Sequence, residues 1–521
     1  MKKEEGEMFR TLLSSLMFLT VTTLAAEFPN VQTTELVNSV PFGVLPLFSV
    51  QSQTLPEDSI DIGYSITNTT FEDTLEIDVL NNPKEVSPFI VLGEVLGFNG
   101  FIWAWDRYVL DKNYARTGPS YWKRNFKEGW EWDHNHWAIN FYGHPYQGAT
   151  YYNFARGAGY GFYGSLLFTA LGSYTWEMFA ETEYPSINDL LATSIGGAVY
   201  GEVLYRLSRK FYGVDESSWY KQVAAFGFAH SAYLQRKVFG NRDGITGNTP
   251  VDMSIFLGTG SHFGNIYRYG GRNEDDLDQR WDDKHIMYGA EIEYGKPFRK
   301  VKRPFDYFTL YTRGEVGPDG TLFQLDVTGK LANAGVHGRG HWVDFATYLD
   351  YSTFYGDFAT VGTISLGTGI DFSLWLLPKL RFRMYHQIYF ILLGTTDMGY
   401  DDLIRTVHPE YESDMDNYQY NMGAKYVLGL ELMVGERFRV KMKTVVDALH
   451  TIPGSLPHYG ADGWDMLLKN YITAEYDLTD KISMGGRLDT YAKVAAYSSE
   501  FFEPMSRGVF AYTLYFSYKL F

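Results

Sequence analysis

Residues 380–390 read LRFRMYHQIYF, and residues 438–447 read FRVKMKTVVD. In the first stretch, mostly apolar residues at even positions alternate with Arg381, Arg383 and other polar or tyrosine residues at odd positions. Successive side chains of a strand point to opposite faces, so this pattern places one face in an apolar medium and the other in a polar one. Such strands are typical of the wall of a membrane barrel.

The same period of two continues from Val251 to the C-terminus. Several segments exceed the usual soluble strand and suit a tilted membrane strand of roughly ten residues. The pattern predicts an antiparallel transmembrane β-barrel of about 12 strands over 251–521, with strands near 251–262, 284–297, 304–316, 320–330, 339–352, 357–371, 377–395, 416–432, 435–450, 465–478, 480–495 and 506–521.

A soluble β-sandwich would also alternate, but here the polar faces carry charges of both signs and the other faces carry almost none. We therefore expect the charged faces to line a lumen. The predicted lumen residues are Arg381, Arg383, Arg439, Lys441, Glu475, Arg487 and Asp489.

The connections alternate in length. Polar stretches at 263–283, 396–415 and 451–464 are long, whereas many intervening turns are short, which predicts long loops outside the cell.

The chain ends on an alternating strand closed by Phe521, which resembles the C-terminal signal read by the barrel-assembly machinery. That resemblance implies the machinery and outer-membrane lipid as partners.

The N-terminus resembles a secretory signal. Lys2, Lys3 and Arg10 precede an apolar run from Leu12 to Leu24, and Ala25 and Ala26 follow, so we expect a signal peptide over 1–26. Residues 27–85 are predicted to be an irregular lead-in. Export and a barrel together indicate the outer membrane of a Gram-negative bacterium.

Composition sets further bounds. The 521 residues contain no cysteine, which excludes disulfides and thiolate metal sites. The formal net charge of −17, without a basic run, argues against a nucleic-acid partner. Aromatic residues make up 17% of the chain, and such residues concentrate at bilayer interfaces.

Residues 86–250 have helical rather than alternating patterns and are predicted to form a periplasmic domain or a plug of the barrel. The apolar stretches 89–110, 166–179 and 190–207 are interrupted by polar residues, so we expect buried or interfacial helices rather than membrane spans. Ser186 and Asp189 form a helix-capping pair. Gly197 and Gly201, one turn apart, let another helix approach closely.

Polar residues gather at 133–206, and two interpretations stay open. His144, Glu177, Glu181 and Asp189 are candidates for acid–base catalysis. Alternatively, a structural network holds the helices together through Arg156, Glu177, Asn188, Asp189, Glu202 and Arg206. No known metal-ligand spacing is present, so we expect neither a metal nor another cofactor.

The same region resembles an uncharacterised bacterial family. The resemblance rests on HPYQG (144–148), YYNFAR (151–156), WE (176–177), PSINDL (185–190), GG (196–197), GE (201–202) and RLS (206–208), and it covers roughly residues 100–240. Members carry a domain of unknown function and are regarded as exported envelope proteins. The resemblance implies a location and assigns no catalytic residue.

Three functions remain open. The first is an outer-membrane protein of transport or structural role, whose partner is a small solute. The second is an envelope enzyme that acts on lipid or cell-wall material through the helical cluster. Of these two, we favour a protein without catalytic activity. The third is a binding module for another envelope protein. Convergence of His144 with Glu177, Glu181 or Asp189 in one open pocket would favour the enzyme.

Overall fold

The computed structural model describes residues 85–211, 218–240, 249–268 and 283–521, apart from short gaps at 319, 339, 357, 401–403, 405–406, 409–417, 500–501, 503 and 521. The expected signal peptide (1–26), almost all of the lead-in (27–85) and Phe521 lie outside the described residues.

The helices α2 to α9 precede the strands, as the change of period near Val251 predicts. The α-helices are α2 (Pro88–Tyr108), α3 (Pro119–Glu128), α4 (His144–Gly157), α5 (Phe162–Phe179), α6 (Ile187–Leu191), α7 (Gly197–Phe211), α8 (Trp219–Phe228) and α9 (His230–Phe239). Two short π-helices, η1 (Ile139–Gly143) and η2 (Ala192–Gly196), directly precede α4 and α7.

Twelve antiparallel strands form one closed barrel in which β1 pairs with both β2 and β12. The prediction of a helical region followed by a barrel of about 12 strands is confirmed. The strands are β1 (Val251–Arg268), β2 (Asp283–Tyr294), β3 (Phe308–Val316), β4 (Thr321–Gly338), β5 (His341–Gly356), β6 (Val361–Leu377), β7 (Leu380–Asp397), β8 (Tyr418–Val434), β9 (Phe438–Thr451), β10 (Gly463–Asp477), β11 (Ile482–Tyr497) and β12 (Met505–Lys519).

Alternate residues of each strand face opposite sides of the wall. Ion pairs between strands that are not neighbours, such as Lys441 on β9 with Glu291 on β2, identify the lumen face. On β12 the predicted apolar face points outward, and Phe510, Leu514 and Phe516 are 63%, 66% and 60% exposed. The wall is therefore apolar outside and charged inside.

The two rims differ in their connections. At one rim the strands are joined by short turns, as at 378–379, 435–437 and 478–481, although the β2–β3 connection spans 295–307. The other rim carries the longer connections 398–417 and 452–462. We refer to them as the turn rim and the loop rim.

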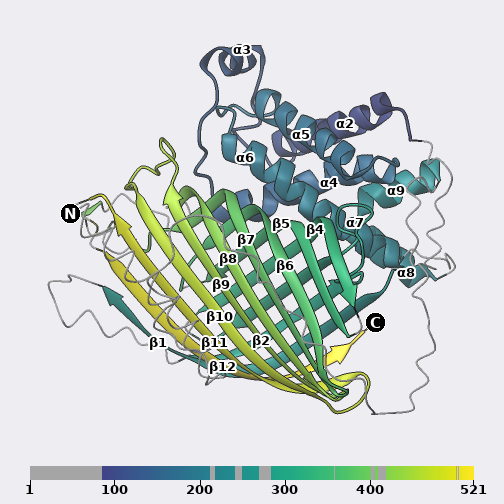
Figure 1. Ribbon diagram of the computed structural model, residues 1–521. Coiled ribbons are helices and arrows are strands. Elements are labelled where there is room, and N and C mark those ends of the chain that lie inside the picture. The colour runs from purple at the N-terminus through teal and green to yellow at the C-terminus, as the bar shows by residue number, and fades with distance from the viewer. Residues whose placement is uncertain are drawn as a thin grey trace. The chain divides into compact units, whose positions relative to one another are not determined.

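The helices pack against the outside of the wall. Leu325 and Val327 alternate with the lumen residue Asp326 and so face outward, yet they are only 8% and 2% exposed. They share a buried cluster with Val203 of α7 and Phe141 of η1. Figure 1 shows α4 and α7 beside β4, β5 and β6. The helices thus lie beside the barrel. We expected either a periplasmic domain or a plug inside the barrel, and these contacts do not form a plug.

Contacts between helices and wall extend from rim to rim. Toward the loop rim, Trp137 Nε1 donates to Thr395 Oγ1 at 2.8 Å, and Asn140 Nδ2 donates to Tyr420 Oη at 2.9 Å. Toward the turn rim, Phe162 at the start of α5 stacks on Phe305 of the β2–β3 connection. The bundle therefore spans the same height as the strands.

Close approach of α4 and α7 fixes the interior of the bundle. A Cβ atom on Gly197 would lie 2.6 Å from the Cα atom of Gly148, and one on Gly201 would overlap the ring of Tyr152. The predicted role of the small residues at 197 and 201 is thus borne out by these contacts, with α4 as the partner helix. Ser186 caps α6 by accepting from the Asp189 amide, as its spacing predicts, but the Ser186 amide donates to Glu177 and not to Asp189.

A buried ion cluster joins the bundle to the barrel. Glu202 accepts from Arg156 Nε and from Arg206 Nε, each at 2.7 Å. Arg206 also donates to Asp306 Oδ1 at 3.0 Å and to the Pro304 carbonyl at 2.8 Å, both in the β2–β3 connection. The Arg206 side chain therefore ties α7 to the turn rim.

We expect Arg206→Ala to destabilise the folded protein by about 3–5 kcal/mol, because it removes one of the two guanidinium partners of the buried Glu202 carboxylate. The check is the Tm of the full chain refolded in detergent. The matched control is Arg116→Ala, whose 2.7 Å pair with Asp111 is exposed and should contribute less than about 1 kcal/mol. Equal melting of both variants and the wild type would contradict the structural role.

Candidate functional site

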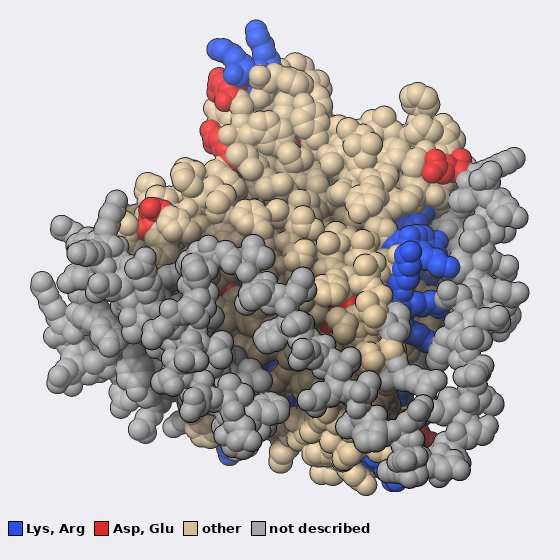
Figure 2. Space-filling view, viewed as in Figure 1, with Lys and Arg blue, Asp and Glu red and all other residues tan. Residues whose placement is uncertain are grey.

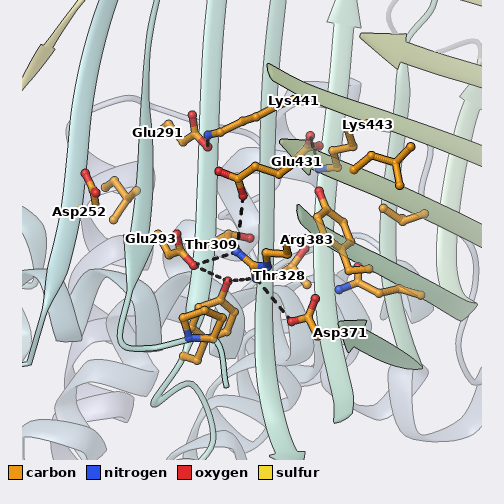
Figure 3. A pocket seen from close by; sticks show the side chains of 18 of the residues that line it. Asp252, Glu291, Glu293, Thr309, Thr328, Asp371, Arg383, Glu431, Lys441 and Lys443 are labelled. Atoms are coloured by element: carbon orange, nitrogen blue, oxygen red, sulfur yellow. Dashed lines mark hydrogen bonds and ion pairs between the residues drawn. The ribbon is translucent and has the colours of Figure 1, made fainter. Parts of the chain in front are cut away.

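A polar cavity of about 530 Å³ occupies the lumen toward the turn rim. The predicted lumen residues Arg381, Arg383, Arg439 and Lys441 all line it. Figure 3 shows Arg383 at the centre of a group of acidic side chains that includes Glu293, Asp371 and Glu431. These four basic side chains therefore share one cavity inside the barrel.

The cavity has a basic wall and an acidic wall. The basic groups come from β7 to β9 and are Arg381, Arg383, Lys425, Arg439, Lys441 and Lys443. Most acidic groups come from β1 to β6 and are Asp252, Glu291, Glu293, Asp326, Asp350 and Asp371. Opposite charges on facing walls set up a field across the lumen, which orients a solute that carries both charges.

These walls are already paired with each other. Lys441 Nζ lies 2.7 Å from Glu291 Oε1, and Arg383 Nη1 lies 3.3 Å from Glu293 Oε1, so both pairs join β2 to strands across the lumen. The acidic partners were not among the predicted site residues. Their signal was nevertheless present, because Glu291 and Glu293 alternate with apolar residues in the segment predicted as the second strand.

The remaining predicted lumen residues, Glu475, Arg487 and Asp489, do not line this cavity. Glu475 and Arg487 line a smaller adjoining space of about 50 Å³. Asp489 is buried and accepts from Arg487 Nη2 at 2.8 Å and from Arg313 Nη1 at 3.0 Å. Asp489 therefore serves a packed ion cluster, and its partner Arg313 was missed by the sequence analysis.

An apolar layer closes the lumen beyond these charges. It is built from lumen-facing side chains near the loop rim and contains Leu322, Phe354, Phe358, Ala359, Val361, Ile391, Leu449, Leu467, Tyr491 and Val509. Phe354 and Leu449 are 0% and 3% exposed, and the rings of Phe354 and Tyr491 lie 5.2 Å apart. The cavity is therefore blind toward the loop rim in this conformation.

A second candidate site lies in the helical bundle, where the structure brings His144, Glu177 and Asp189 together. One possible ligand atom of each lies within 4.8 Å of the others, and all three residues are buried. The Nε2 atom of His144 lies 3.5 Å from Asp189 Oδ1, and Nδ1 lies 3.3 Å from Thr193 Oγ1. We call these three residues, with Asp133 and Glu181 beside them, the carboxylate cluster.

Local hydrogen bonds hold the cluster in place. Glu177 Oε2 accepts from the Ser186 amide at 2.9 Å, and Asp189 Oδ1 accepts from Asn188 Nδ2 at 2.9 Å. Glu181 Oε1 accepts from Trp176 Nε1 at 2.6 Å. The residues of the expected structural network thus form two groups. Arg156 and Arg206 both pair with Glu202. Glu177 and Asp189 belong to the carboxylate cluster, and Asn188 donates to Asp189.

Burial raises the pKa of carboxyl groups in this cluster. Burial and the nearby Asp189 carboxylate together raise the pKa of Asp133 to about 7. Burial also raises the pKa of Glu181 to about 7, although His144 opposes that shift. Asp133 lies in the predicted polar run but was not among the candidate site residues, since nothing in its spacing connects it to Asp189.

A third group was missed by the sequence analysis. His262, His285 and Glu315 lie on the lumen face of β1, β2 and β3 with ligand atoms within 4.8 Å of one another. His262 Nε2 lies 2.9 Å from Glu315 Oε2, and Arg313 Nε lies 3.4 Å from Glu315 Oε1. Alternation places each residue on the lumen face, and only strand register shows that they meet.

Comparison with known proteins gives a family match and distant structural likenesses. Residues 129–229 match the family model described as "Domain of unknown function (DUF3943)", which confirms the resemblance and spans the whole carboxylate cluster. No curated protein matches the chain.

Among solved structures, the chain is similar to KdgM porin (7% identity over 51% of this chain and 98% of that one, TM-score 0.22). It is also similar to the outer membrane channel DcaP of Acinetobacter baumannii (9% identity over 52% of this chain and 97% of that one, TM-score 0.23). A third similar structure is the translocator domain of the autotransporter NalP from Neisseria meningitidis (10% identity over 51% of this chain and 88% of that one, TM-score 0.23). This chain thus combines a twelve-stranded barrel with a helical region that is similar to this family over residues 129–229.

Proposed function

We propose that this chain is an outer-membrane transport protein whose lumen binds a small solute carrying both positive and negative groups. The observation that carries the proposal is the two-sided wall: apolar side chains cover the outside, and a cavity of about 530 Å³ with opposed basic and acidic walls lies inside. Only closed barrels and helices satisfy their backbone groups within a bilayer, and this sheet has no free edge.

The blind lumen indicates how such transport is controlled. A solute that enters from the turn rim meets the cross-lumen ion pairs Lys441–Glu291 and Arg383–Glu293. Its own charged groups can then pair with these side chains in place of the ion pairs. Beyond them the apolar layer excludes water, and hydrophobic constrictions of this kind close pores to ions. Passage therefore requires displacement of that layer.

The helical bundle, in this proposal, lies within the bilayer beside the barrel instead of in the periplasm as expected. Its outer helices expose apolar side chains: Phe89 and Phe101 on α2 are 83% and 61% exposed, and Leu167 on α5 is 61% exposed. Among the described residues, α2 is the helix long and apolar enough to cross a membrane, with a mean hydropathy of 1.3. In Figure 2 the surface over the helices is largely uncharged between the charged groups near α3 and a basic group near α7 to α9.

The envelope-enzyme alternative retains one supporting observation, which is the convergence of His144, Glu177, Glu181 and Asp189. Glu177 and Asp189 are only 2% and 3% exposed, however, so the groups meet inside the bundle and not in an open pocket. A cluster without access for a lipid or glycan favours a role in binding a small ion or in stabilising the bundle.

We expect the wild-type chain to give little steady current in planar bilayers, because the apolar layer closes the lumen. The double variant Phe354→Ala, Leu449→Ala should raise the conductance by about an order of magnitude by removing large buried side chains from that layer. The control is Leu514→Ala, on the outer face, which should conduct like the wild type. A double variant as closed as the wild type would argue against a transport path.

Site-directed labelling tests the placement of the bundle. The chain has no cysteine, so Leu167→Cys and Lys127→Cys each carry one thiol. In intact outer membranes a water-soluble maleimide should label Lys127→Cys, on exposed α3, much faster than Leu167→Cys, and detergent should remove the difference. Equal labelling in both conditions would place the bundle in water and restore the periplasmic interpretation.

A further inference from the structure

We propose that His144, Glu177 and Asp189 bind one divalent transition-metal ion, with Asp133 and Glu181 beside them as additional carboxylates. This site is separate from the lumen and does not depend on the proposed transport role. The ion would be Zn²⁺, Mn²⁺ or Fe²⁺, because one imidazole nitrogen with carboxylate oxygens suits these ions better than Ca²⁺ or Mg²⁺, which prefer oxygen ligands alone.

The ligand geometry supports the site. One donor atom from each of the three residues lies within 4.8 Å of the others. The 3.5 Å between His144 Nε2 and Asp189 Oδ1 is close to the separation of about 3.4 Å expected for two ligands that each lie about 2.1 Å from a tetrahedral ion. The imidazole edge therefore faces a carboxylate at a spacing that one ion can bridge.

The orientation of His144 is fixed from outside the site. His144 begins α4 directly after the π-helix η1, and its Nδ1 atom lies 3.3 Å from Thr193 Oγ1 in the second π-helix, η2. Short π-helical turns inside α-helices are frequent at functional sites. A hydrogen bond on one ring nitrogen that aims the other nitrogen at the ion is the usual arrangement around metal-bound histidines.

The charge balance also indicates a cation. The charged neighbours of Glu177 are Asp189, Glu181 and Asp133, and those of His144 are Glu181 and Asp133. The buried guanidinium groups of Arg156 and Arg206 are instead bound to Glu202. Burying several carboxylates without a compensating cation is costly, and a divalent ion bound among them would offset that cost.

The group of His262, His285 and Glu315 makes a poorer cation site. Arg313 Nε lies 3.4 Å from Glu315 Oε1, so a guanidinium already neutralises the carboxylate of this group and would repel a divalent ion. The two groups therefore provide a matched comparison, since both contain buried histidine and carboxylate donors but only one has a cation beside it.

The test is calorimetric titration of the chelator-treated full chain, refolded in detergent, with ZnCl₂ and separately with MnCl₂. We expect about one ion per chain and a rise in Tm of about 5 °C at saturation. His144→Gln and Asp189→Asn should each weaken binding at least about ten-fold. His285→Gln should bind like the wild type.

Two results would overturn the proposal: no binding of either ion by the wild type, or loss of binding in His285→Gln. If His144→Gln or Asp189→Asn does not fold, the comparison of wild type with His285→Gln still decides. X-ray absorption at the metal edge then provides a second measurement. One histidine nitrogen among oxygen ligands supports the assigned site, and two histidines contradict it.

Discussion

Closure of the sheet between β1 and β12 is the constraint on which the rest of the structure depends. Once β1 pairs on both sides, every strand has two neighbours, and the wall can only present its alternate side chains to two different surroundings. The outer set is apolar, and the inner set carries charges that must be matched within the lumen. The cross-lumen pairs at Glu291 and Glu293 are the consequence of that inner requirement.

The barrel could be predicted because alternation is a local signal. Arg381, Arg383, Arg439 and Lys441 reach the lumen by the same period that placed Phe510 and Leu514 outside. The position of the helices could not be predicted in this way. An outward-facing Leu325 or Val327 gives the same pattern whether lipid or a helix covers it, and only the burial of these side chains shows the helix.

The ion cluster around Glu202 and the carboxylate cluster also differ in how far the sequence predicts them. Glu202 and Arg206 are one helical turn apart, so their pairing follows from spacing. The carboxylate cluster instead gathers residues from a loop, the start of α4, the end of α5 and α6. Its assembly depends on two π-helices, which shift the helical register in a way that no residue pattern in this sequence indicates.

The division of polarity among the helices has a consequence for biogenesis. α5 and α2 present apolar surfaces outward, whereas the inner helix α7 carries Glu202 and Arg206 and rests on strands that come later in the chain. The side of α7 that faces the wall includes Val203 and is apolar, and the strands that cover it come later in the chain. The packing of the bundle is therefore complete only once the barrel has closed, so the folding of the helices depends on the folding of the strands.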